Sequence, residues 1–269
     1  MIDLSNKEKY KIDIKSSKGN QPKWKIGNLY YKQDYLGYEG LVEYVVSELL
    51  KKTNLDKNEF VEYKTEIIKN GNNTRNGCVS KNFLEEKQSL VTLVKLYRNN
   101  YSQRLINQDV LKIESLADRV KFIENKVYDF TGIENFGKYF CKMMEIDSFF
   151  LNEDRHFNNV ALIYENDNYK LCPIFDNGSA LLSDVMYDYP MNDDIYSLID
   201  QAKPKAFVYD FYEQIKTMEE LHGQQIEFYF NKNDIKDILN KEPYYDSNQK
   251  DRVKNILFEQ MRKYSYLFK

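Results

Sequence analysis

The chain of 269 residues is long enough for one large domain or for two lobes around a cleft. Its 39 Lys and Arg nearly balance its 42 Asp and Glu, so no overall positive field attracts nucleic acid, and we expect no direct nucleic-acid partner. A hydrophobic fraction of 42% with 23 Tyr and 16 Phe excludes a disordered chain.

Strand patterns dominate the first third of the chain, with one helix among them. Leu41, Val45 and Leu49 repeat every four residues, which predicts an amphipathic helix that ends near Thr53. Before this helix, a break at residues 18–23 separates two β-prone stretches, which predicts a hairpin with a flexible loop. The predicted strands cover residues 10–14, 24–31, 59–68 and 78–84, with a polar loop at 72–77.

The rest of the chain is predicted to be mostly helical, because its apolar residues recur every three or four positions. The helical patterns cover residues 90–96, 105–123, 136–150, 206–222, 232–240 and 249–266. One segment differs: apolar stretches at 160–164 and 169–175 flank the polar residues 165–168, which predicts a β-hairpin. We therefore expect an α+β fold with a small β-rich lobe over residues 1–85 and a larger, mostly helical lobe over residues 86–269.

Two polar segments flank this hairpin and carry the oxygen atoms that a metal needs. Asn159 precedes the first strand and Asp176 follows the second. If the turn lies between residues 166 and 167, Asn159 faces Ile174 and lies diagonal to Asp176, at roughly 7–8 Å. Mg²⁺ prefers oxygen ligands and is usually held by one or two protein oxygens together with substrate phosphates. Asn159 and Asp176 are therefore the predicted Mg²⁺ ligands.

Asp154 stands five residues before Asn159, which is the spacing between the catalytic Asp and the metal-binding Asn of the kinase catalytic loop. In that loop the Asp accepts the proton of the attacking hydroxyl, so Asp154 is the predicted general base. Residues 154–159 read DRHFNN, which resembles the DRHxxN loop of the HipA-like kinases, where a strand pair and a metal-binding Asp follow. Phosphatidylinositol kinases carry a similar DRH loop.

The resemblance to HipA-like kinases implies a two-lobed, protein-kinase-like fold that uses ATP and Mg²⁺. It implies transfer of the γ-phosphoryl group of ATP to a Ser or Thr hydroxyl of a protein substrate, with autophosphorylation at Ser16, and an antitoxin-like partner. Two alternatives stay open. The same site can belong to an inositol-lipid or small-molecule kinase, and the chain can be a non-catalytic nucleotide-binding module of the toxin–antitoxin type.

The N-terminal part of the chain resembles the nucleotide-binding part of the same family. Residues 16–23 are similar to the family's phosphate-covering loop, which implies that Ser16, Gly19 and Lys23 contact the phosphates. Lys32 corresponds to the strand Lys that contacts the α- and β-phosphates.

Glu43 lies in the predicted helix where the family places the carboxylate that pairs with this Lys, and Glu39 and Glu48 are alternative partners from the same helix. Adenine binding is expected in the segment that joins the lobes, with Val79 and Phe83 as its predicted contacts.

Each of these assignments competes with a purely structural interpretation. Lys32 can be a solvated Lys at a strand end, and Asp176 with the following Asn177 and Gly178 can be a simple turn. Many kinases have Phe at the position of Asn177, so switching by a Phe side chain is not expected here. His156 is expected to be a buried, hydrogen-bonded support for its loop rather than a metal ligand.

The cysteines and the apolar patterns bear on the compartment. Cys78, Cys141 and Cys172 are far apart and form no CxxC pair, which indicates a reducing environment. The first nine residues lack the apolar segment of a secretory signal, and no run approaches the ~20 apolar residues of a membrane span. We therefore expect a cytoplasmic protein, with non-classical secretion or delivery into a host left open.

Overall fold

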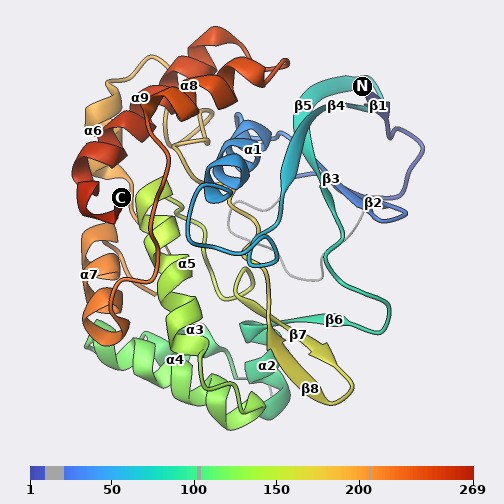
Figure 1. The fold of residues 1–269 in the computed structure, drawn as a ribbon. Coiled ribbons are helices and arrows are strands. Elements are labelled where there is room, and N and C mark those ends of the chain that lie inside the picture. Colours follow the sequence, from blue (N-terminus) through green and yellow to red (C-terminus); the bar gives the residue numbers. More distant parts are fainter. Residues whose placement is uncertain (10–20, 102–103, 206) are drawn as a thin grey trace.

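The computed structural model describes residues 1–9, 21–101, 104–205 and 207–269, and it has two lobes (Figure 1). A curled five-stranded sheet and one helix form the smaller lobe. A three-stranded sheet and the remaining helices form the larger lobe. The α+β class and the two-lobed arrangement expected from the sequence are confirmed.

The sheet of the smaller lobe has the strand order β1-β4-β5-β3-β2. Residues 24–31, expected as one strand, form two strands, because Gly27 takes a φ of 58° and reverses the chain. The prediction of a loop at 72–77 is also wrong, because the chain already turns at Gly71 and the next strand begins at Asn73. The predicted strand at 10–14 lies outside the described residues. The strands are β1 (Ile2–Asp3), β2 (Lys23–Ile26), β3 (Leu29–Gln33), β4 (Tyr63–Asn70) and β5 (Asn73–Lys81).

Helix α1 (Glu39–Leu50) packs against β4 and β5, with Val45 and Leu49 fully buried as the periodicity predicts. The helix approaches the sheet closely at Gly40. A Cβ at this position would lie 2.5 Å from the carbonyl carbon of Gly77 in β5. The absence of a Cβ on Gly40 therefore lets the helix and the strand come into backbone contact, which sets how deep Glu43, one turn further on, sits in the protein.

The larger lobe confirms most of the predicted helices and corrects two of them. The helix expected at 90–96 begins only at Leu93, because the residues before it pair with β7 as a strand. The helix expected at 105–123 is two helices, the second of which is capped by Ser115.

The elements of this lobe follow in chain order. They are β6 (Ser89–Thr92), α2 (Leu93–Asn100), α3 (Ile106–Val110), α4 (Leu116–Thr131), α5 (Phe136–Phe150), β7 (Ala161–Glu165), β8 (Asn168–Leu171), α6 (Ile195–Gln201), α7 (Phe211–His222), α8 (Lys232–Lys241), α9 (Ser247–Lys263) and a 3₁₀ turn (Ser265–Leu267).

Helix α5 is the centre of the hydrophobic core and contacts α4, α7 and α9. Met143, Met144, Phe149 and Phe150 are buried in it, as expected from the sequence. The helix ends at Leu151, whose φ of 56° turns the chain sharply toward residues 152–159. None of the helices in the described ranges is long and apolar enough to cross a membrane.

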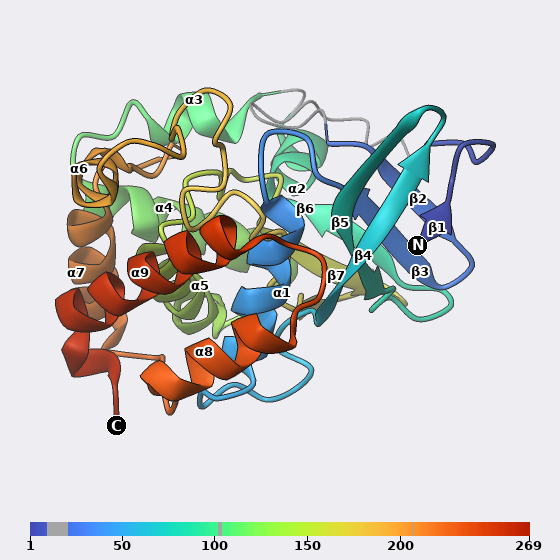
Figure 2. The ribbon, with the colours of Figure 1, turned by 90° about the horizontal axis from the view of Figure 1, so that it is seen from above.

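Several contacts join the two lobes. Viewed from above, α8 lies beside α1 (Figure 2). The hydroxyl of Tyr38, the residue before α1, donates to the carbonyls of Leu181 and Leu182 at 2.7 and 3.0 Å. A parallel bridge connects Phe60 to Ile174. The start of α1 and the segment after the β7–β8 hairpin are therefore held together.

Candidate active site

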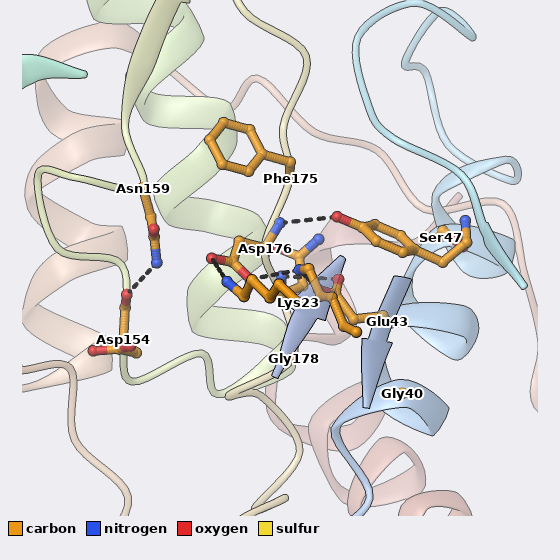
Figure 3. Close-up of polar contacts among 12 residues, drawn as sticks. Lys23, Gly40, Glu43, Ser47, Asp154, Asn159, Phe175, Asp176 and Gly178 are labelled. Atoms are coloured by element: carbon orange, nitrogen blue, oxygen red, sulfur yellow. Dashed lines mark hydrogen bonds and ion pairs between the residues drawn. The ribbon is translucent and has the colours of Figure 1, made fainter. Parts of the chain in front are cut away.

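The loop after α5 is fixed by its own hydrogen bonds. Asn152 donates from its side chain to Oδ1 of Asp147 at 2.8 Å, which secures the turn out of α5. The side-chain amide of Asn159 donates to the carbonyl of Asp154 at 3.1 Å (Figure 3). This hydrogen bond uses the amide nitrogen of Asn159, so its Oδ1 atom can coordinate a metal ion.

The β7–β8 hairpin has the predicted register, because Leu162 pairs with Leu171. The pairing does not extend as far as expected. The strands end at Ala161 and Leu171, and Ile174 bridges to Phe60 instead of facing Asn159. The strand ladder therefore does not determine how Asn159 and Asp176 lie relative to each other.

Asn159 and Asp176 nevertheless line one cleft between the lobes, together with Asp154 and Lys23. Figure 3 shows Asp154 and Asn159 on one side and Asp176 with Lys23 on the other. The described residues contain no cluster of three or more His, Cys, Asp or Glu side chains that could hold a metal. The donor set here, one amide and one or two carboxylates, fits an ion such as Mg²⁺ that takes its other oxygens from phosphates and water.

Lys32 lies at the junction of the two lobes, in β3. Its Nζ contacts Oε1 of Glu43 at 2.5 Å and Oδ1 of Asp176 at 2.6 Å. The ion pair expected between Lys32 and Glu43 is therefore present. Of the alternative partners, Glu48 contacts Lys51, and Glu39 accepts backbone N–H groups such as that of Leu36.

Lys23 adds a second positive charge beside Asp176. It stands directly opposite Lys32 in the β2–β3 register, and its Nζ is 3.6 Å from Oδ2 of Asp176. Two like charges in facing positions destabilise a sheet unless an anion lies between them. Asp176 supplies that anion, because its two carboxylate oxygens contact the two ammonium groups.

The electrostatics of this group follow from burial and pairing. Burial alone lowers the pKa of Lys32, but attraction to Asp176 and Glu43 outweighs it and raises the pKa above the usual range. Burial alone raises the pKa of Asp176, but attraction to Lys23 and Lys32 dominates and holds it well below the usual range. The lysine is therefore charged and the carboxylate ionised at neutral pH.

The remaining predicted residues lie in different surroundings. Val79, in β5, pairs with Tyr31, and Phe83 follows this strand and contacts Phe175, with ring centroids 5.8 Å apart and the rings tilted by 34°. Ser16 and Gly19 lie outside the described residues. The hydrogen-bonded ring expected for His156 is wrong, because neither ring nitrogen has a hydrogen-bond partner among the residues that the structure describes.

Arg155 is a buried residue of the site for which the sequence analysis predicts no role. Its guanidinium binds the carboxylate of Asp147 through Nε and Nη2 at 2.9 and 3.0 Å. A lone Arg between Asp154 and His156 carries no sequence signal for burial, since Arg is mostly exposed in proteins. Asp147, eight positions earlier in the helical pattern of residues 136–150, is the one available hint.

Comparison with known proteins identifies the fold. No protein-family model matches the chain, and no curated protein matches its sequence. Among solved structures, the proinflammatory kinase CtkA of Helicobacter pylori is similar with a TM-score of 0.61 and 18% identity, covering 97% of this chain and 94% of that chain.

A second solved structure, a complex of the toxin–antitoxin system proteins HipA and HipB of Shewanella oneidensis MR-1 with operator DNA, gives a TM-score of 0.50 and 14% identity. It covers 93% of this chain and 65% of that chain. At these identities the likeness concerns the fold. The chain therefore has the two-lobed kinase-like fold of CtkA and HipA, and the resemblance to HipA-like kinases expected from the sequence is confirmed at that level.

Proposed function

We propose that this chain is an ATP-dependent kinase of the HipA-like type, which transfers the γ-phosphoryl group of ATP to a Ser or Thr hydroxyl of a protein. One observation carries the proposal: the Nζ of Lys32 contacts both Glu43 and Asp176, on the cleft that Asp154 and Asn159 also line. A lysine held by a helix carboxylate next to a second, ionised carboxylate is the arrangement that protein kinases use for phosphoryl transfer.

The proposed roles follow from the charges. Lys32 and Lys23 bind phosphate oxygens, which replace Asp176 as partners of the two ammonium groups. Asp154 accepts the proton of the acceptor hydroxyl. The oxygen of that hydroxyl bonds to the γ-phosphorus, and the bond from the γ-phosphorus to the leaving ADP oxygen breaks. Asn159 and Asp176 are the residues that would hold Mg²⁺, which when bound neutralises negative charge on the phosphates. Positioning and electrostatics supply most of the catalysis.

The proposal extends to the parts of the chain around the site. We place the boundary between the lobes near residue 85, between the end of β5 and the start of β6. Val79 and Phe83 are the proposed adenine contacts, and Ser16, Gly19 and Lys23 the proposed phosphate contacts. By analogy with the HipA–HipB complex, we also propose an antitoxin-like protein partner.

The acceptor class is tested by incubating the purified chain with Mg²⁺ and γ-labelled ATP in three parallel mixtures: a protein mixture, phosphoinositide vesicles, and the chain alone. We expect label on protein Ser or Thr, and mass spectrometry of the chain alone to find phosphate at Ser16. Label on lipid would support the inositol-lipid alternative. Nucleotide binding without any transfer would support the non-catalytic alternative.

A further inference from the structure

The side chain of Arg155 contacts three separate segments of the larger lobe. It is 4% exposed and binds Asp147 on α5. Its Nη1 donates to the carbonyl of Phe175 at 2.5 Å and to the carbonyl of Asn159 at 3.3 Å. Its Nη2 donates to Oδ1 of Asn177 at 2.6 Å. One guanidinium thus holds α5, the end of the Asp154 loop and the segment that carries Asp176.

Asn177 extends this set of contacts into the smaller lobe. Its side chain accepts from Arg155, and its backbone N–H donates to Oε2 of Glu43 at 3.0 Å. The other oxygen of Glu43 accepts from Lys32. An unbroken chain of polar contacts therefore runs from Lys32 through Glu43, Asn177 and Arg155 to Asp147, and all five side chains are buried.

We propose that Arg155 and Asn177 are positioning residues that set the distance between Asn159 and Asp176 and connect these two residues to the Lys32–Glu43 pair. The strand ladder cannot do this, because the β7–β8 pairing ends at Ala161 and Leu171. Arg155 instead binds the carbonyl of Asn159 itself and the carbonyl next to Asp176. The inference rests on the proposed function in that Asn159 and Asp176 are there the metal ligands.

The chemistry of the two residues fits this role. Arg has five N–H donors in a fixed plane, whereas Lys has one ammonium that cannot reach Asp147, Asn177 and both carbonyls together. Asn177 supplies a buried acceptor and adds no charge. A side chain of similar size without that acceptor, such as Leu, leaves a donor of Arg155 unpaired in the interior. Residues that orient metal ligands in this way change metal affinity by about 10- to 100-fold when altered.

The first test needs no ligand. Hydrogen exchange is measured over residues 154–159 and 175–178 in the wild-type chain and in Asn177→Leu, Asn177→Asp and Arg155→Lys. We expect exchange in both segments to accelerate about tenfold or more in Asn177→Leu and Arg155→Lys, because each loses buried hydrogen bonds, and in Asn177→Asp as well, because it buries a new charge at this position. Gln214→Leu is the matched control, because Gln214 is a buried amide of the same lobe that bonds Met144 and Ser148 instead.

The second test measures binding of a non-hydrolysable ATP analogue by calorimetry over a range of Mg²⁺ concentrations. Asn177→Leu and Arg155→Lys are expected to raise the Mg²⁺ requirement about tenfold, and Gln214→Leu to leave it unchanged even if its melting temperature falls. If Asn177→Leu does not fold, Arg155→Lys still decides the question. Exchange and Mg²⁺ requirement like those of wild type in Arg155→Lys would overturn the inference. A wild-type chain that binds no nucleotide would reject the proposed function, and the exchange result would then decide the inference by itself.

Discussion

At the scale of single residues, Lys32 is the side chain on which the site depends. It neutralises two carboxylates from different lobes, Glu43 and Asp176, and it is 8% exposed. A buried carboxylate that loses its cation is strongly destabilising, and the cost is smaller where the partner is in part exposed, as Asp176 is.

Replacing Lys32 by Met is therefore expected to lower the free energy of unfolding by roughly 3 kcal/mol, because Glu43 stays buried without its cation. The double variant with Glu43→Gln should recover part of this loss. Urea unfolding measures both. The control is Lys25→Met, because Lys25 is an exposed residue of the same β2–β3 hairpin. A loss of unfolding free energy in Lys32→Met no larger than in Lys25→Met would contradict the account.

Residues whose placement follows from spacing along the chain could be predicted from the sequence, and residues whose role depends on tertiary contacts could not. Asp154, Asn159 and Asp176 were predicted because their chemistry depends on spacing along the chain around one hairpin. The link from Arg155 to Asn177 depends on a tertiary contact that spacing does not encode. The lack of a hydrogen bond to the His156 ring, whose Nε2 lies 3.8 Å from Oδ2 of Asp154, was likewise missed, since side-chain hydrogen bonding depends on neighbours from other segments.

At the scale of elements, the contact between α1 and β5 places Glu43 at Lys32. The contact is close because Gly40 lacks a Cβ, which would lie 2.5 Å from the carbonyl carbon of Gly77. The sequence predicted this helix from its apolar repeat. It gave no indication of the close approach, and it placed two strand boundaries wrongly where Gly27 and Gly71 turn the chain.

Gly40→Ala tests this contact, because the close approach determines whether the substitution raises or lowers the stability of the fold. In an unobstructed helix, Ala stabilises by about 0.5–1 kcal/mol relative to Gly. Here the added methyl meets the Gly77 backbone, so we expect destabilisation of about 1–3 kcal/mol instead. Thermal unfolding measures the change, with Glu48→Ala in the same helix as a control that should shift stability by less than about 0.5 kcal/mol. Stabilisation by Gly40→Ala would contradict the close approach.

At the scale of the whole molecule, α5 joins the core to the loop that carries Asp154 and Asn159, and it holds a buried acid besides Asp147. Burial raises the pKa of Glu145 to about 8, although its carboxylate accepts the backbone N–H of Gln225 at 2.9 Å. Helix α5 also packs on α7, which carries the neighbouring Glu219. The two lobes were predicted from apolar residues that recur every two positions in strands and every three or four in helices. These patterns do not predict that the carboxyl group of Glu145 is buried between helices.

The raised pKa of Glu145 makes overall stability depend on pH. The folded chain keeps a proton there that the unfolded chain loses at its usual pKa near 4.5, so the free energy of unfolding should fall as pH rises from about 4.5 to about 8. The slope contributed by this residue is at most about 1.4 kcal/mol per pH unit. Glu145→Gln should show a flatter profile in urea unfolding at pH 5 to 8. Glu220→Gln, an exposed Glu of α7, should keep the wild-type slope, and equal slopes in all three chains would contradict the assignment.

The central claim, that the cleft transfers phosphate with Asp176 and Asp154 as essential groups, is tested most directly by the initial rate of label transfer from γ-labelled ATP. Wild type, Asp176→Asn, Asp154→Asn and the exposed-site control Asp237→Asn are compared at equal concentration after circular dichroism has shown each to be folded. The account predicts transfer in wild type and Asp237→Asn and a loss of at least about 100-fold in the other two. Transfer by Asp176→Asn or Asp154→Asn at the wild-type rate would contradict it.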